Sequence, residues 1–515
     1  MALIIPVCLF FINIWIFIPF FNLGLFGDDW LAIFRYSYYL EAPKHLGTYS
    51  TEYFNNFKYL FNAYGSQDTL MAFLYKMFGT ESSIYFVLSY LLRLCAGLTI
   101  YLPAFYLTKN KLASFFAVFF FLFSAIGLDA SGWVFNMPSY LTITFSNIFL
   151  YFYIRSYYEK RRNYLFISYI FFFLSFISTL IRSHGLIPFI IFLEILWLIS
   201  KRFWKSALFR ITGFFLIFLL IYLLGFKETL SGNALVSIKG GFTTTSNLLS
   251  QGRFDFLFYP IITLGSMLVP ETLVPRGWEI TSFSQYLFRI FLPIFFIFLM
   301  INIILASNIK NLTPRFLRIT TVVSVFWSIM VVLVYKFNLT TLSSAQAVSL
   351  LLIGGFFFIL VVTIIANLKS NTFVKMGLLI ALGWTIISFF FPWWTNPGYI
   401  YITTHRYLIV SSMGVSLLIA VIIGLGKNTK SVFTIIILGS IFMLLHAFST
   451  RNYIERLYLT HSGETVKKIW SQMPYIPEVG QSSEPLVFYF ESDGTNAAIL
   501  GDSVGFGFTF HMAIL

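Results

Sequence analysis

The sequence predicts an all-α polytopic membrane protein, and three observations carry this prediction. Apolar residues make up 58% of the 515 positions, aromatic residues 21% and charged residues 10%, a composition typical of a protein whose outer surface faces lipid. Apolar runs recur at the length that crosses a bilayer. The connections between these runs alternate between basic and acid-containing segments.

The apolar runs predict about 13 transmembrane helices, since a spanning helix needs about 20 mostly apolar residues. One further run, residues 256–270, would invert the orientation of every later connection if it crossed the membrane, so we expect it to be interfacial or re-entrant. The predicted spans are 2–25, 83–107, 112–128, 138–156, 164–182, 185–200, 211–226, 286–306, 319–335, 347–366, 376–392, 408–425 and 431–447.

The charge of the connections predicts the orientation in the membrane. Six alternate connections contain 17 of the 34 Lys and Arg residues but one acid, Glu159, and such segments belong in the cytoplasm. This places the N-terminus on the cytoplasmic side of a plasma (inner) membrane and the tail on its external side. The formal net charge of +14 then reflects topology, and no nucleic-acid partner is expected. The six basic connections are 109–111, 155–163, 201–210, 310–318, 367–375 and 427–430.

The remaining connections and the tail carry nearly all the acids and are expected outside, at 26–82, 129–137, 227–285, 393–407 and 448–515. The first of these loops mixes aromatic and charged residues at helical spacing, which predicts interfacial helices. Residues 227–256 are rich in Gly, Ser and Thr, which predicts a flexible lid.

Two domains are expected, a transmembrane domain at 1–447 and a small external domain at 448–515. The tail begins with a helical pattern and then alternates as short strands do, which predicts an α+β fold. No Lys or Arg precedes the first apolar run, so we expect that run to be retained and not to be a removed signal peptide.

Two adjacent acids, Asp28 and Asp29, open the first external loop directly after the first span. One interpretation is structural, because acids favour the start of a helix. The other is functional, because two carboxylates that share a site repel and raise the pKa of one, which suits a general base or a cation site. At the level of the lipid headgroups, such a base would meet a lipid-linked substrate.

This layout resembles the GT-C superfamily of integral-membrane glycosyltransferases. A long N-terminal span, an acidic pair opening a large external loop and an external tail are similar to protein O-mannosyltransferases and bacterial aminoarabinose transferases. The segment HRYLIVSSMGVSLLIA at 405–420 resembles one in the tetratricopeptide-bearing transmembrane mannosyltransferases, although this chain lacks their tetratricopeptide tail. The Asp28–Asp29 pair also departs from the Asp-Glu pair of the O-mannosyltransferases, which leaves the acceptor class open.

The resemblance implies a polyprenyl-phosphate sugar donor and a transfer that inverts the anomeric carbon. Asp28 or Asp29 would take the proton of an acceptor hydroxyl on a glycan, lipid or protein. Asp129, the single acid of the second loop, would hold a cation or orient the acceptor, and its alternative is a solvated loop acid. If a divalent cation is needed, Asp28, Asp29 and Asp129 are its candidate ligands.

Basic and aromatic residues at the same predicted face are candidates for the donor phosphate and sugar. A guanidinium binds phosphate through two parallel hydrogen bonds, and it stabilises charge on the leaving group. For Arg406 the alternative is a topology anchor, and for Arg182 it is a side chain that extends from a helix end to the interface. The candidates are Arg406, His405, Tyr407, Arg182 and His184.

Two other functions fit the same composition. A lipid-linked glycan polymerase or ligase would use the same surface and a similar donor. A membrane transporter or lipid flippase would show charges inside the bilayer, and Glu194 in the sixth predicted span is such a charge without an assigned role. No HExxH, paired CxxC or GxSxG pattern occurs, so zinc peptidase and serine hydrolase functions lack support.

Overall fold

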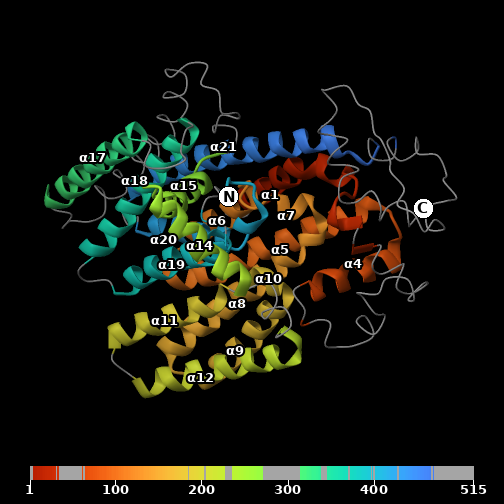
Figure 1. Cartoon of the computed structure of the whole chain (residues 1–515), viewed down its shortest axis with the longest axis horizontal. Coiled ribbons are helices and arrows are strands. Elements are labelled where there is room, and N and C mark those ends of the chain that lie inside the picture. Colours follow the sequence, from red (N-terminus) through yellow and green to blue (C-terminus); the bar gives the residue numbers. More distant parts are fainter. Residues whose placement is uncertain are drawn as a thin grey trace.

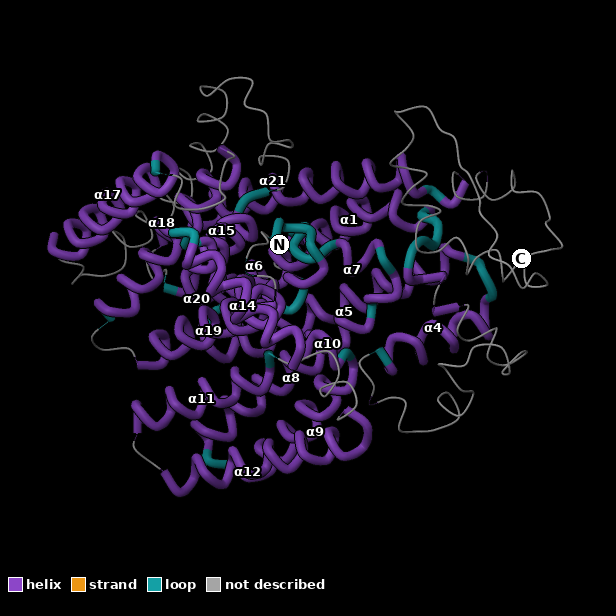
Figure 2. Tube along the Cα trace, in the orientation of Figure 1, coloured by secondary structure: helices purple, strands orange, loops and turns teal. Residues whose placement is uncertain are grey.

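The computed structural model describes most of the transmembrane part of the chain and little of the tail. The described residues are 4–30, 32–33, 61, 64–183, 185–201, 204–226, 235–270, 314–337, 345–368, 372–395, 397, 401–425, 429–464 and 468. These residues are predominantly helical and contain no strand beyond an isolated bridge between Leu23 and Ser462 (Figure 2). For the described part of the chain, the predicted all-α architecture agrees with the structure.

The helices follow the predicted apolar runs along the sequence. Each run falls on a helix except 286–306, which lies outside the described residues. The helices are α1 Ile4–Phe17, η1 Ile18–Asn22, α4 Gly65–Phe78, α5 Ser82–Thr108, α6 Lys111–Phe123, α7 Asp129–Gly132, η3 Val134–Asn136, α8 Pro138–Glu159, α9 Arg162–Ser178, α10 Leu180–Ser183, α11 Leu186–Lys201, α12 Trp204–Ile221, η4 Tyr222–Phe226, α14 Leu235–Ser250, α15 Asp255–Leu268, α17 Pro314–Lys336, α18 Ala345–Asn367, α19 Thr372–Thr395, η7 Arg406–Leu408, α20 Ser411–Gly424 and α21 Thr429–His461.

The number of membrane-spanning helices differs from the prediction of thirteen. Within the described residues, 4 helices are both long and apolar enough to cross a membrane, namely α5, α12, α18 and α19. Helices such as α6, with 13 residues, and α20, with 14, are shorter than the apolar runs that predicted them. At about 1.5 Å per residue they rise only about 20 Å, against about 30 Å of hydrocarbon. The prediction counted apolar residues that lie in turns at helix ends.

The core of the bundle forms around α20. Residues 411–423 of this helix are all buried, and α20 packs on α5, α6 and α19. Such a helix is apolar on every side because protein, not solvent, surrounds it. Around this core, α8 packs on α5 and α9, and α15 and α17 pack on α18. In Figure 1, α21 runs along the upper edge with α1 beside it, and α12 lies along the lower edge.

Two predictions about the external loops change with the structure. Residues 235–250 form the helix α14, so the predicted flexible lid at 227–256 is wrong for this part. Apolar residues at helical spacing explain the difference, since Phe242 packs on Trp394 with ring centroids 4.7 Å apart. The α15 helix packs on α18 and α19, and its residues 262–268 are buried in protein. That burial favours the re-entrant alternative over an interfacial helix.

The first external loop contains a helix of the expected amphipathic kind. In α4, Gln67, Met71 and Leu74 are buried while Phe73 and Met77 on the other face are 58% and 59% exposed. A helix with one apolar face in solvent contact is suited to lie along a membrane interface.

The last described helix, α21, is continuous over 33 residues. The predicted domain boundary between 447 and 448 therefore falls inside this helix, and the expected helical start of the tail belongs to α21. The strands predicted further along the tail lie outside the described residues.

Three of the basic connections, 109–111, 155–163 and 367–375, lie close to one another at one end of the bundle. Tyr158, near the end of α8, packs on Phe373 at the start of α19, with ring centroids 4.8 Å apart. Lys109 lies 3.8 Å from the centre of the Tyr106 ring and 5.9 Å from that of Phe373. The charge pattern assigned these connections to one side of the membrane, and their proximity is compatible with that assignment.

Candidate functional site

Four segments expected on the outer side meet at the other end of the bundle. We call them the loop cluster, defined as residues 24–30, 124–137, 180–183 and 401–410. Backbone hydrogen bonds tie the second and fourth segments together, from Gly127 N–H to the Thr403 carbonyl at 2.8 Å and from Asp129 N–H to the Thr404 carbonyl at 3.0 Å. These segments are far apart in the sequence, and the contacts bring most of the predicted site residues into one region.

Asp29 fastens the first segment to the second. Its side chain is fully buried, and one carboxyl oxygen accepts the Phe135 N–H at 2.8 Å while the other accepts the Phe26 N–H at 3.3 Å. The bond to Phe26 resembles a capping box, in which a side chain reaches back three residues at a helix start. Burial raises the pKa of Asp29 well above its usual value, the backbone hydrogen bonds lower it and the charge of Asp28 raises it further.

Asp28 is half-buried, whereas its neighbour is fully enclosed. A helical turn begins at Asp28, directly after Gly27, whose φ of +59° is a left-handed conformation that glycine adopts without strain. A Cβ at position 27 would also lie 3.0 Å from the Trp133 ring, so the turn runs against this indole. Of the acid pair, Asp28 is therefore the more accessible carboxylate.

Asp129 links the second segment to α21. Its carboxylate accepts a hydrogen bond from the Tyr453 hydroxyl at 2.5 Å. Burial raises the pKa of Asp129 to about 6, while the hydrogen bond from Tyr453 and the charge of Arg406 hold it lower than burial alone would. The second and fourth segments of the loop cluster approach each other closely at Gly127, which has a φ of +66°. A Cβ at this position would lie 2.5 Å from the Ile409 Cα. The expectation of a freely solvated loop acid does not fit this environment.

Arg406 lies over the Trp133 ring, with its guanidinium carbon 4.5 Å from the ring centre. Trp133 in turn stacks on Phe26 at a centroid distance of 6.0 Å. The three side chains come from the first, second and fourth segments of the loop cluster. Arg406 is half-buried, so one side of the guanidinium remains accessible. A cation–π contact of this kind orients the charge without neutralising it.

Arg182 is a buried cation with incomplete hydrogen bonding. Its side chain is 8% exposed, and its Nη2 donates to the Asn136 side-chain oxygen at 3.1 Å. Within the described part of the chain, its Nε and Nη1 have no hydrogen-bond partner. A cavity of about 10 Å³ adjoins Arg182 and Ser388, close to the room that one water molecule needs. Burial lowers the pKa of Arg182 to about 10, so it remains charged at neutral pH.

Tyr407 brings the two arginines together. The guanidinium carbon of Arg182 lies 4.1 Å from the Tyr407 ring centre and that of Arg406 lies 5.5 Å from it. Burial is the main cause of the lowered pKa of Arg182, and the charge of Arg406 lowers it further. An anion between them would relieve this repulsion.

His405 is a neutral acceptor and not a third cation. Burial, together with the charges of Arg406 and Arg182, lowers the pKa of His405 to about 3. Its Nδ1 accepts the Tyr407 N–H at 3.2 Å, which fixes the start of the η7 turn. His184, the other predicted histidine, lies outside the described residues.

The predicted cation site does not form as a group of three ligands. Among the described residues, no three His, Cys, Asp or Glu side chains come together in a way that would hold a metal ion. Asp29 uses both oxygens on backbone N–H groups, and Asp129 accepts from Tyr453. These bonds give both carboxylates protein partners.

Several residues of the site were not predicted. Tyr453 and His461 of α21 contact the loop cluster, with the His461 ring 4.6 Å from Phe26 and its carbonyl accepting the Gly24 N–H at 2.8 Å. Gln67 of α4 donates to the Phe135 carbonyl at 3.2 Å. These residues stand in ordinary helical sequence, where only the tertiary fold reveals their proximity.

The chain was compared with protein-family models, curated proteins and solved structures, and none of them matches it. The chemistry of the site is therefore argued from the loop cluster itself. It combines two cations of which one is incompletely bonded, one accessible carboxylate, and two carboxylates held by hydrogen bonds.

Proposed function

We propose that this protein is a membrane glycosyltransferase that moves a sugar from a polyprenyl-phosphate donor to an acceptor hydroxyl at the outer membrane face. The observation that carries the proposal is the buried guanidinium of Arg182, with two nitrogen atoms unpartnered among the described residues and with the Arg406 guanidinium also near the Tyr407 ring. A buried charge is costly unless it is paired, so a site of this kind favours an anion such as phosphate.

The reaction assigns a different task to each side chain. Asp28 takes the proton from the acceptor hydroxyl, and the acceptor oxygen forms a bond to the anomeric carbon. The bond from that carbon to the phosphate oxygen breaks, and its electron pair leaves with the phosphate. Arg406 and Arg182 stabilise the negative charge that grows on the leaving phosphate. Attack opposite the leaving group inverts the anomeric carbon.

Asp29 and Asp129 position the reacting groups in this scheme. Asp29 holds the Asp28 turn against the second segment through the Phe135 N–H, and Asp129 connects α7 to Tyr453. Preorganised groups cost no reorganisation as charge develops, which is a principal source of catalysis. In the GT-C resemblance either aspartate would serve as the base, and the burial of Asp29 favours Asp28.

Asparagine variants of the acid pair test the assignment. Asp28→Asn keeps size but cannot accept the proton, so transfer from a panel of polyprenyl-phosphate sugars should fall by about 10²–10⁴ with donor binding little changed. Asp29→Asn replaces one acceptor oxygen by an amide donor that faces an N–H group, so it should lower stability. A fully active Asp28→Asn enzyme, in a preparation where the wild type transfers sugar, would refute the catalytic role.

Two other functions make distinct predictions in the same assay. A lipid-linked glycan polymerase or ligase would accept an oligosaccharide donor and extend or transfer it as a block. A transporter or lipid flippase is favoured by one observation, the buried Glu194–Arg210 pair inside the helical bundle. It would move lipid phosphate across vesicles without forming a glycosidic bond, and Asp28→Asn would leave that movement intact.

A further inference from the structure

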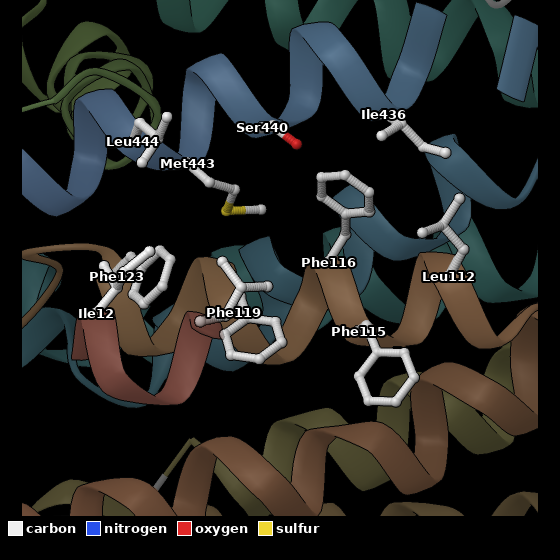
Figure 3. Close-up of a pocket in the computed structure, with 11 residues that line it drawn as sticks. Ile12, Leu112, Phe115, Phe116, Phe119, Phe123, Ile436, Ser440, Met443 and Leu444 are labelled. Atoms are coloured by element: carbon white, nitrogen blue, oxygen red, sulfur yellow. The ribbon is translucent and has the colours of Figure 1, made fainter. Parts of the chain in front are cut away.

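A second feature outside the loop cluster is an apolar groove on the side of the bundle. It lies between α1, α6 and α21 and has a volume of about 370 Å³ (Figure 3). In Figure 3, Phe116, Phe119 and Phe123 of α6 face Ser440, Met443 and Leu444 of α21 across the groove. The other lining residues are Leu9, Ile12, Leu112, Phe115 and Ile436.

Beside the groove, α6 and α21 are in close contact. A Cβ at Gly439 would lie 2.5 Å from the Phe116 ring, so the glycine lets this ring reach the α21 backbone. Phe120 of α6 also stacks on Phe442 of α21, with ring centroids 5.9 Å apart. Ser440 is the one polar residue among the eleven in the lining. A cavity with such a lining does not hold ordered water.

The three helices that form the groove also lead to the loop cluster. The chain continues from α1 through η1 to Asp28, α6 leads to Asp129, and α21 carries Tyr453, which bonds to Asp129. From Leu112 to Phe123, α6 rises about 16 Å at about 1.5 Å per residue. From Leu444 to Tyr453, α21 rises about 14 Å on the same basis. Together these lengths reach about 30 Å, the thickness of the hydrocarbon core.

We propose that this groove holds the hydrocarbon tail of the lipid phosphate whose headgroup lies at Arg182 and Arg406. The proposal rests on the function proposed above and adds the place of the donor's tail. Charge and apolarity are complementary to a single amphiphile: the two cations belong to the loop cluster, and the apolar groove lies between three helices that lead to this cluster. A long isoprenoid chain has the length to occupy both, whereas a short one ends before the groove begins.

A groove-filling variant tests the proposal by chain length. Ser440 is exposed, so Ser440→Trp should fill the groove without disturbing the core. The matched control is Ile437→Trp on the same helix, where the isoleucine is 43% exposed and does not line the groove. Affinities for undecaprenyl phosphate and for geranyl phosphate are measured in lipid nanodiscs, with the melting temperature as a check on folding.

We expect Ser440→Trp to weaken undecaprenyl phosphate binding by roughly tenfold or more, since several buried CH₂ groups lose their contact, and to leave geranyl phosphate unchanged. Ile437→Trp should change neither affinity. Unchanged undecaprenyl affinity in Ser440→Trp would overturn the groove assignment and leave the proposed function standing. Loss of a copurified phospholipid, with that affinity unchanged, would identify a phospholipid site instead. A wild type that binds neither lipid phosphate would overturn both proposals.

Discussion

Two buried arginines at different ends of the bundle differ in their hydrogen-bond partners. Arg210, near the start of α12, makes two hydrogen bonds to the Glu194 carboxylate, both at 2.7 Å, and the Tyr153 hydroxyl also bonds to this carboxylate. Arg182, in the loop cluster, makes one hydrogen bond to the neutral side chain of Asn136 and leaves its Nε and Nη1 without a partner among the described residues. Both side chains are largely withdrawn from solvent.

Under the proposed function, the difference separates a structural charge from a binding charge. A buried ion contributes to a stable fold only when its partners replace the lost water, and the pair of Arg210 with Glu194 meets this condition. Arg93 does so in another way: it donates to the Phe121 and Ser124 carbonyls at 2.9 and 2.6 Å and to the Tyr140 hydroxyl, and among the described residues only its Nε lacks a partner. Arg182 has only one protein partner, as expected of a cation that bonds to a ligand or to a water in the adjoining cavity.

The largest effect on stability is expected when the Arg210–Glu194 pair is broken. Glu194→Gln removes the charge that balances Arg210 inside the bundle and should destabilise the protein by about 3–5 kcal/mol. Thermal unfolding in detergent measures the change. The surface pair Arg155–Glu159 provides the control, because its partners are 22% and 30% exposed. Glu159→Gln should cost only about 0.3–0.5 kcal/mol. Equal losses for the two variants would contradict the distinction between the buried and the surface pair.

Replacing Arg182 should lower ligand affinity without lowering stability. Arg182→Met replaces a buried charge by an apolar side chain, so stability should stay the same or rise. The affinity for polyprenyl phosphate should fall by about 1.5–3 kcal/mol, the value of a hydrogen bond to a charged group, and Arg406→Ala should weaken it similarly. Isothermal titration with the wild type as reference measures both. A destabilised Arg182→Met protein with full affinity would make Arg182 structural, like Arg210.

A smaller effect concerns pH at the same end of the bundle. Because burial raises the pKa of Asp129 to about 6, the folded state binds a proton that the unfolded chain, with a pKa near 3.8, does not. The resulting stability is present at low pH and is lost as pH rises through about 6. Unfolding between pH 4 and 7 should therefore show this loss, and Asp129→Asn should flatten the profile. An Asp129→Asn profile that keeps the same slope would assign the dependence to another group, such as Asp29.

Much of the fold was predictable because the bilayer limits what the chain can do. Apolar runs located the helices, since each backbone group in lipid must bond within its own helix. The length of each helix was not predictable in the same way. The run 112–128 was expected to span the membrane, yet α6 ends at Phe123. Near this end, the Arg93 guanidinium donates a hydrogen bond to the Phe121 carbonyl. Nothing local to the run marks that end.

The sequence could select the polar residues that meet in the loop cluster, but not their contacts. Loop charge and position selected Asp28, Asp29, Asp129, Arg182 and Arg406. The sequence treats Asp28 and Asp29 as equivalent, and only the fold shows that the Phe135 N–H binds one of them. The contact of Tyr453 with Asp129 was beyond prediction, because it joins residues separated by 324 positions.

The central claim, that the loop cluster binds a lipid phosphate, is tested most directly by locating that phosphate. A structure of the protein with polyprenyl phosphate in nanodiscs, determined by electron cryomicroscopy, provides the measurement. The account predicts phosphate density within hydrogen-bond distance of the Arg182 and Arg406 guanidinium groups, beside the Tyr407 ring. Phosphate density at the opposite end of the bundle, beside Lys109 and the other basic connections, with none at Arg182, would contradict it.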